Sequence, residues 1–265
     1  MLTRQRIDSL VICIAGFAAV AILLVFLACD SAEAADQPRK ARLTGGQAID
    51  RAAQAWKPIY DYQTILHQME THPSGEVKQF WARVQMVRPT EDHQDLESSF
   101  LLELFDHPIS RAANAPEDAT PSKIYFADAS QLFYTINPEA NTIIIENLNE
   151  RTSPLPEFMY LAGFLDFDIE TFKEKAYIDS DVFQETIHET ETYRIHIQPR
   201  KEKRDVEPPR YLWIDRKTSL PEKFTVDADV RIDVLFTETR TNQGLKSEEL
   251  MPQVREDAVI DYRTQ

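Results

Sequence analysis

The segment from Tyr193 to Phe236 constrains the fold of this chain more than any other. It begins with Tyr-Arg-Ile-His-Ile-Gln-Pro, in which apolar and polar residues alternate as they do in a strand with one buried and one exposed face. Three further stretches with strand character follow at residues 211–214, 224–226 and 230–237, separated by turn residues or charged loops. Four consecutive strands with such connections predict an antiparallel meander, whose apolar face something must cover.

Helical periodicity occurs in two places before this meander. From Gln47 to Met69, apolar residues recur mostly at spacings of three and four, which predicts an amphipathic helix that Pro58 interrupts. Pro154 to Phe172 has prolines and Glu157 near its start, which favours a short helical insert. Because strands come in blocks rather than alternating with helices, the chain is predicted to be α+β with an antiparallel sheet. The other predicted strands cover residues 80–87, 100–105, 123–126, 131–136, 142–148 and 258–260.

The amino terminus has the pattern of an export signal. Arg4 and Arg6 precede an unbroken apolar run from Leu10 to Ala28, and Ala32–Ala34 provides small residues at the positions that a signal peptidase reads. The run is also long enough to be retained as a membrane anchor. Lipidation at Cys29 is a third alternative. All three predict a periplasmic location for the domain that follows.

We therefore divide the chain into a signal peptide or membrane anchor at residues 1–34, a tether at 35–45 and one folded domain at 46–265. The two cysteines, Cys13 and Cys29, both lie in the leader, so the domain contains no disulfide, thiol nucleophile or cysteine zinc site. A formal net charge of −15 disfavours nucleic acid and anionic lipid headgroups as partners. The histidines lack metal-ligand spacing and no catalytic or nucleotide-binding motif occurs, so we expect neither an enzyme nor a bound metal or cofactor.

Several segments resemble, in the same order, those of the LolA-like superfamily of periplasmic outer-membrane lipoprotein carrier proteins. Lys123 to Pro138 is similar to the family's strand–turn–strand motif, and Pro154 to Phe164 to the short helix that follows it. Tyr193 to Pro199 resembles the family's Leu-x-Leu-x-Pro strand. Leu212 to Pro221 is similar to the next strand, which ends in a Leu-Pro turn, and Asn242 to Leu250 resembles the closing segment.

This resemblance covers residues 47–263 and implies a curved, unclosed antiparallel sheet, or half-barrel, with helices covering its concave face. It implies a carrier that binds the acyl chains of lipids or lipoproteins in a hydrophobic cavity and meets partner proteins of the inner or outer membrane. It also implies that an arginine at the cavity mouth, here Arg88, bonds lid carbonyls and holds the lid shut. A membrane-tethered envelope sensor or regulator with the same fold is the alternative. The candidate ligand-binding residues are Trp56, Tyr60, Trp81, Phe100, Leu102, Phe133, Tyr134, Phe158, Leu161, Phe164, Tyr193, Ile195, Trp213, Phe224 and Phe236.

Overall fold

The computed structural model describes residues 39–109, 120–130, 132–147, 176–199 and 208–263. The chain divides into two compact units, Met1–Arg39 and Lys40–Gln265. The second unit contains nearly all of the described residues, and the fold and the site are described within it. None of the described helices has the length and apolarity that crossing a bilayer would require.

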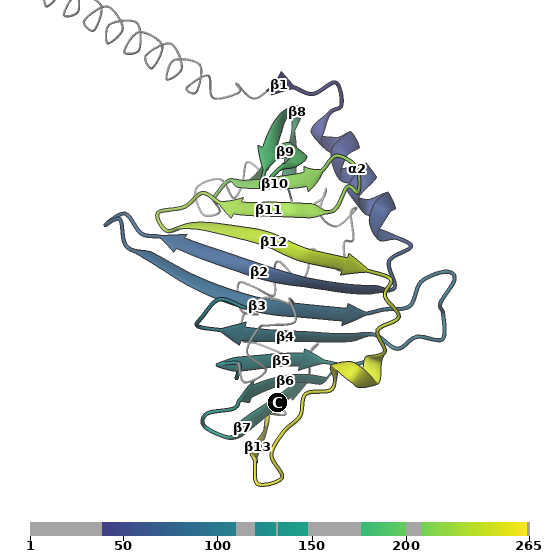
Figure 1. Cartoon of the computed structure of the whole chain (residues 1–265), viewed down its shortest axis with the longest axis vertical. Coiled ribbons are helices and arrows are strands. Elements are labelled where there is room, and N and C mark those ends of the chain that lie inside the picture. Colours follow the sequence, from purple (N-terminus) through teal and green to yellow (C-terminus); the bar gives the residue numbers. More distant parts are fainter. Residues whose placement is uncertain (1–38, 110–119, 131, 148–175, 200–207, 264–265) are drawn as a thin grey trace, which may run out of the picture. The chain divides into compact units, whose positions relative to one another are not determined.

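One large, unclosed sheet forms this unit (Figure 1). Its thirteen strands lie in the order β1-β8-β9-β10-β11-β12-β2-β3-β4-β5-β6-β7-β13. The strand pairs from β8 across to β7 are antiparallel, and β13 joins β7 in parallel. The predicted fold class, α+β with a half-barrel sheet, is confirmed. The strands are β1 (Arg39–Lys40), β2 (Asp61–Thr71), β3 (Val77–Val87), β4 (Ser99–Phe105), β5 (Lys123–Ala127), β6 (Leu132–Asn137), β7 (Thr142–Asn147), β8 (Ala176–Ile187), β9 (Thr190–Pro199), β10 (Arg210–Asp215), β11 (Pro221–Val226), β12 (Arg231–Thr241) and β13 (Val259–Arg263).

The helix α2 (Gly45–Trp56) is shorter than predicted. It begins at a capping box, in which Thr44 accepts from the backbone of Gln47 while the Gln47 side chain accepts from the backbone of Thr44. The predicted continuation of this helix to Met69 is wrong, because Asp61–Thr71 is the strand β2. β2 lies in the middle of the sheet and is buried on both faces, so its apolar residues fall at helical spacings by coincidence.

The strand predictions are confirmed for β3 to β7 and for the meander, which is β9 to β12 in consecutive places of the sheet. β8 was not predicted. Its register with β9 shifts between Ile178 and Val182, and this irregularity breaks the alternation that would have marked it as a strand. The predicted strand at 258–260 is β13, which is longer than expected. The predicted helical insert from Pro154 to Phe172 lies outside the described residues.

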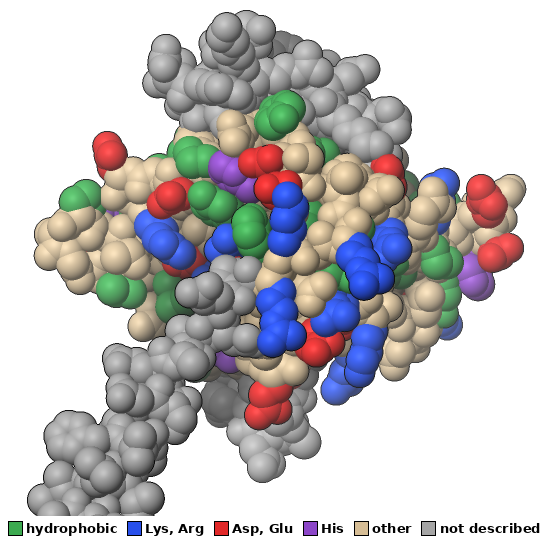
Figure 2. All heavy atoms as spheres, turned by 90° about the horizontal axis from the view of Figure 1, so that it is seen from above, with side chains coloured by type: hydrophobic (Ala, Val, Ile, Leu, Met, Phe, Trp, Pro, Cys, Tyr) green, Lys and Arg blue, Asp and Glu red, His purple; other side chains and the backbone are tan. Residues whose placement is uncertain are grey.

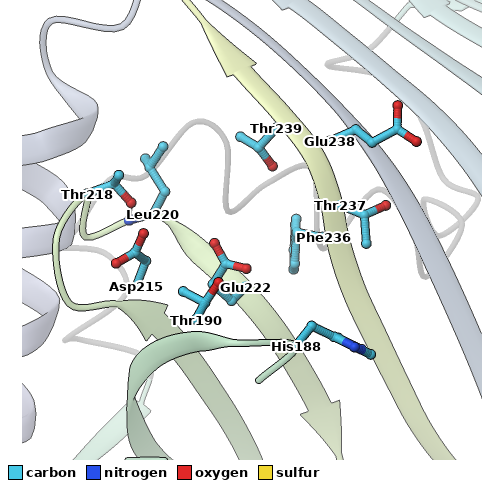
Figure 3. Close-up of a pocket in the computed structure, with 10 residues that line it drawn as sticks. All are labelled: His188, Thr190, Asp215, Thr218, Leu220, Glu222, Phe236, Thr237, Glu238 and Thr239. Carbon is cyan, nitrogen blue, oxygen red and sulfur yellow. Dashed lines mark hydrogen bonds between the residues drawn. The ribbon is translucent and has the colours of Figure 1, made fainter. Parts of the chain in front are cut away.

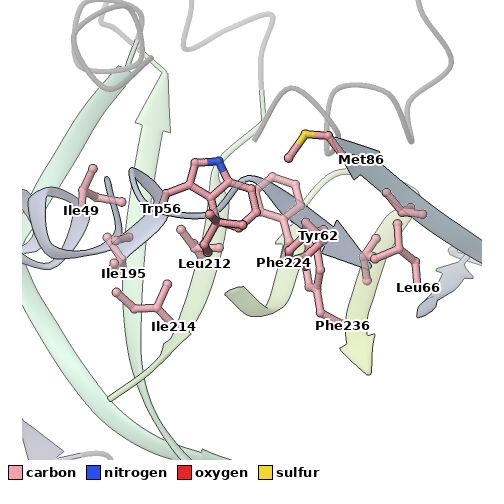
Figure 4. Packing of buried hydrophobic residues seen from close by; sticks show 14 of the residues in the cluster. Ile49, Trp56, Tyr62, Leu66, Met86, Ile195, Leu212, Ile214, Phe224 and Phe236 are labelled. Atoms are coloured by element: carbon pink, nitrogen blue, oxygen red, sulfur yellow. The ribbon is translucent and has the colours of Figure 1, made fainter. Parts of the chain in front are cut away.

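The two faces of the sheet carry separate hydrophobic clusters. We call the face on which α2 packs the helix-side face; its cluster includes Ile49 and Trp56 of α2 and Tyr62, Ile195 and Phe224 of the strands (Figure 4). The opposite face, which we call the far face, has its own cluster on β3 to β7, which includes Leu250 of the short 3₁₀ helix η2 (Ser247–Leu250). Cover on both faces accounts for the nearly continuous apolar sequence of β4.

Charge is distributed unevenly on the surface. Figure 2 shows the end of the molecule that carries α2, where Lys and Arg side chains gather on one part of the surface and Asp and Glu lie beside them. The net charge of −15 is therefore not spread uniformly.

Candidate functional site

The helix-side face is the candidate site, because it is a broad apolar surface under a single described helix. Alternate residues of β2 to β6 and of β9 to β12 point to this face. The ring of Trp56 lies edge-on to that of Tyr62, with centroids 4.9 Å apart, so α2 contacts the centre of the sheet (Figure 4). Eight of the candidate residues lie in or against this cluster: Trp56, Phe100, Leu102, Phe133, Tyr193, Ile195, Phe224 and Phe236.

Three other candidates lie on the far face, so the structure does not bring them together with the rest. The ring of Trp81 stacks on that of His67 at 4.8 Å, and Tyr134 lies 5.5 Å from Phe126 between ring centroids. Successive residues of a strand point to opposite faces. The chain neighbours of Trp81, Tyr134 and Trp213 are on the helix-side face; they are Ala82, Phe133 and Leu212. The third residue, Trp213, donates from Nε1 to Glu185 at 2.7 Å under the ammonium of Lys223.

The remaining candidates lie elsewhere. Tyr60 follows α2 in the chain and does not belong to the cluster. Its ring lies tilted against that of His93, with ring centroids 4.2 Å apart. Phe158, Leu161 and Phe164 lie outside the described residues.

Arg88 binds the carboxyl-terminal end of α2. Its Nε donates to the carbonyl oxygen of Ile59 at 2.8 Å, and its Nη2 donates to that of Trp56. The guanidinium carbon also lies 5.5 Å from the centroid of the Trp56 ring. The last carbonyls of a helix have no partner within the helix and form its negative end, so a cation suits this place. Arg88, which directly follows β3, thus holds both the backbone and the indole at the end of α2.

A second clasp fixes the connection from α2 to β2. Asn242 accepts a hydrogen bond from the backbone N–H of Tyr60 at 3.0 Å and donates from Nδ2 to the carbonyl of Pro58. Asp61 is fully buried, and its carboxylate accepts backbone N–H groups of three consecutive residues at 3.0, 2.7 and 3.0 Å. These donors are Gln243, Gly244 and Leu245. Neither residue was singled out from the sequence as a contact of the helix, since both have partners that are about 180 positions away.

The buried side of α2 is made mainly of small residues. It presents Gly45, Ala48, Ala52 and Ala53 to β8 and β9, together with two larger side chains near its middle and its end. Because alanine and glycine bury little apolar area, separating this helix from the sheet costs less than separating a leucine-rich helix would. The apolar contact that holds α2 on β8 and β9 is therefore modest.

A pocket of about 370 Å³ opens at one side of the sheet (Figure 3). Leu220 and Phe236 belong to the helix-side face or pack against it, and Glu222 lies beside Asp215 and Thr190. Burial, and then the negative charge of Asp215, raise the pKa of Glu222 to about 7. The pocket is lined by His188, Thr190, Asp215, Thr218, Leu220, Glu222, Phe236, Thr237, Glu238 and Thr239.

Within the described ranges, no group of three or more His, Cys, Asp or Glu side chains could hold a metal ion. The polar contacts found around α2 fasten backbone segments to one another. What the arrangement offers a ligand is apolar area under a helix that a few polar bonds hold in place.

Comparison with known proteins yields structural neighbours only, since no family model and no curated protein matches the chain. One neighbour is a putative outer membrane lipoprotein-sorting protein domain from Vibrio parahaemolyticus, with 12% identity over 78% of this chain and 97% of that one and a TM-score of 0.39. Another is the LolA superfamily protein NE2245 from Nitrosomonas europaea, with 9% identity, coverage of 79% and 98% and a TM-score of 0.35. A DUF1329 family protein from Desulfovibrio piger has 11% identity, coverage of 78% and 95% and a TM-score of 0.43. The neighbours thus include the superfamily that the sequence resembles, and at these identities the likeness concerns the fold alone.

Proposed function

We propose that the protein is a periplasmic carrier that binds the acyl chains of lipids or lipoproteins against the helix-side face of its sheet. The observation that carries this proposal is the pairing of an apolar sheet face with a helix that Arg88 fastens at one end. We propose no catalytic step, and the ligand is recognised by apolar contact.

The energetic demand on such a carrier is simple. An acyl chain exposed to water is unfavourable by about 0.8 kcal/mol for each CH₂ group, and transfer onto an apolar surface recovers much of that free energy. The apolar side chains of β8 and β9, together with Tyr62 of β2 beneath Trp56, offer such a surface once α2 moves aside. When no ligand is bound, α2 covers this part of the face and keeps it from water.

Arg88 acts in this proposal as the latch. Its bonds are made to backbone carbonyls, which water satisfies equally well when the helix lifts away. Exchanging these hydrogen bonds for hydrogen bonds to water changes the free energy only modestly. An apolar contact of the same strength would instead expose apolar surface to water each time the helix lifts away.

The test is uptake and release of a fluorescent fatty acid by the purified protein. Arg88→Ala should raise both rates by about tenfold, because two charge-assisted hydrogen bonds that hold the closed lid are lost. Arg83→Ala is the matched control. It removes an arginine from β3, the strand that ends just before Arg88, and this arginine is paired with Glu103 at 2.9 Å on the far face. Equal uptake and release rates in the two variants would show that Arg88 does not hold the helix closed.

Lipid mass spectrometry on protein isolated from the cell envelope tests the binding itself. Recovery of acyl-containing molecules, lost on solvent extraction and regained on incubation with the membrane fraction, is the expected result. Protein that is repeatedly empty and takes up no fatty acid would rule out the carrier.

The tethered sensor or regulator remains the second candidate, because the apolar run at residues 10–28 is long enough to serve as an anchor. Amino-terminal sequencing of the mature protein separates the two. A chain that begins at Ala35 is free to cross the periplasm, as a carrier must. A chain that still begins at Met1, or one that begins at a lipidated Cys29, is held at a membrane and favours the sensor.

A further inference from the structure

Exposed apolar side chains are concentrated near the end of the chain. Seven large hydrophobic residues are exposed among the described residues, and five of them lie between positions 251 and 262. Isolated exposed hydrophobic residues are ordinary, but a concentration of them marks a surface that meets another molecule. The five are Met251, Val254, Val259, Ile260 and Tyr262.

The strand β13 carries three of these five residues at the end of the sheet (Figure 1). It pairs in parallel with β7, and no described strand lies on its other side. All five of its residues are exposed. An edge strand of this kind presents a row of backbone N–H and C=O groups to any strand that can add to it.

The apolar pattern of the far face continues onto this edge. Register places Phe126, Tyr134, Ile145 and Tyr262 side by side on four neighbouring strands, β5, β6, β7 and β13. Phe126 is 4% exposed and Ile145 is 9% exposed, whereas Tyr262 is 67% exposed. One further strand beside β13 would therefore complete a row that now ends at the surface.

The charges of β13 indicate which strand fits. Asp261 and Arg263 lie on either side of Tyr262, and within the strand their side chains form an ion pair of 3.1 Å. If a second β13 is laid antiparallel with Tyr262 at the centre, each Asp261 faces the Arg263 of the other strand. A parallel, in-register pair would instead place Asp261 against Asp261, which is unfavourable. The strand is thus complementary to itself in one orientation and register.

We propose that β13 is a self-association edge, through which two copies of this chain join their sheets by antiparallel β13–β13 pairing centred on Tyr262. The two Tyr262 rings extend the far-face row across the contact, and two reciprocal Asp261–Arg263 pairs set the register. This contact is independent of what the helix-side face binds.

The size of the edge sets the strength of the contact. A strand of five residues buries much less than the roughly 1,200–2,000 Å² of a standard stable interface. We therefore expect an association that depends on protein concentration and is favoured where copies are confined to the same membrane or compartment.

Cysteine cross-linking of the full chain in cell envelopes tests the register. Tyr262→Cys places two thiols directly opposite each other, with their Cβ atoms about 4.5–5.5 Å apart. A small shift of the strands brings them to the roughly 3.5–4.5 Å of a disulfide. Val259→Cys is the matched control, since Val259 is 65% exposed on the same strand. Its two copies would lie roughly 20 Å apart, because six residues separate them along the paired strands. The parent chain, whose cysteines are Cys13 and Cys29, shows how much cross-linking those two residues cause by themselves.

A second test reverses the charges of Asp261 and Arg263 in the Tyr262→Cys variant. Asp261→Arg or Arg263→Asp alone should lower the yield of disulfide-linked dimer by about tenfold, because like charges then face each other. The double change restores opposite charges and should return the yield to within about twofold of the parent. Rescue of this kind cannot come from general damage to the fold.

Three results would overturn the proposal. They are equal dimer yields from Tyr262→Cys and Val259→Cys, yields that ignore the single charge changes, and cross-linking of Tyr262→Cys to a different protein instead of to itself. The last result would assign the edge to another partner.

Discussion

Gly45 is the residue at which α2 approaches the sheet most closely. A Cβ atom there would collide with the backbone carbonyl of Asp179 and come within 2.7 Å of the Ile178 side chain. We expect Gly45→Ala to lower the free energy of unfolding by about 1–3 kcal/mol, because β8 or the helix must shift. Urea denaturation measures this change.

Gly46 supplies the control for that substitution. A Cβ atom at Gly46 meets nothing within 4 Å, and both glycines lie in the first turn of α2. Gly46→Ala should leave stability unchanged or raise it by up to about 1 kcal/mol through helix propensity. Similar losses in the two variants would show that close approach at Gly45 does not matter.

Glu222 makes stability depend on pH. Its pKa is raised from 4.5 to about 7 in the folded protein, first by burial and then by Asp215, so the folded state holds the proton more tightly than the unfolded chain. Stability is therefore highest below pH 4.5 with respect to this group and falls as pH rises towards 7. After allowance for solvent screening at a half-buried side chain, we expect a loss of about 1–2 kcal/mol.

The Glu222→Gln variant should lack this loss. It should resemble the parent at pH 5 and be more stable than the parent at pH 8, as followed by urea denaturation at each pH. The control is Glu248→Gln, which removes one negative charge from an exposed residue. A parent and a Glu222→Gln variant with parallel pH profiles would show that Glu222 titrates as an ordinary surface group.

At the scale of elements, Asp61 joins the first residue of β2 to the segment after β12. Its carboxylate accepts three backbone N–H groups while fully buried, and the amide of an asparagine would turn an NH₂ group towards some of those donors. Asp61→Asn should lower the free energy of unfolding by about 2–4 kcal/mol, measured by urea denaturation. Asp229→Asn, at an exposed turn residue, should change it little. A small effect at both positions would mean that water replaces the clasp.

Eleven of the thirteen strands form two runs of consecutive strands, and β1 and β13 lie at the two ends of the sheet. β8 to β12 form one run and β2 to β7 the other, and the β12–β2 pair joins them. This order places α2, which precedes every strand of the second run, against β8 and β9 of the first. The helix thus packs on strands that come more than a hundred residues later in the chain.

The sequence by itself determined part of the local structure of this protein. Alternation predicted the meander of β9 to β12, and the strands β6 and β7 were predicted at 131–136 and 142–148, because both patterns depend on backbone preferences over a few residues. The resemblance identified the sheet type and drew attention to Arg88, whose acceptors on α2 only the structure revealed.

Only the tertiary structure decided that residues 61–69 form a strand and which backbone groups bind Asp61. It also decided on which face of the sheet Trp81, Tyr134 and Trp213 lie. Strands that are buried on both faces lose their alternation, so an apolar run tells neither helix from strand nor one face from the other. The donors to Asp61 are about 180 residues away, and only the pairing of β12 with β2 brings them within hydrogen-bond distance. Composition and period cannot encode such contacts, because they depend on which strands become neighbours.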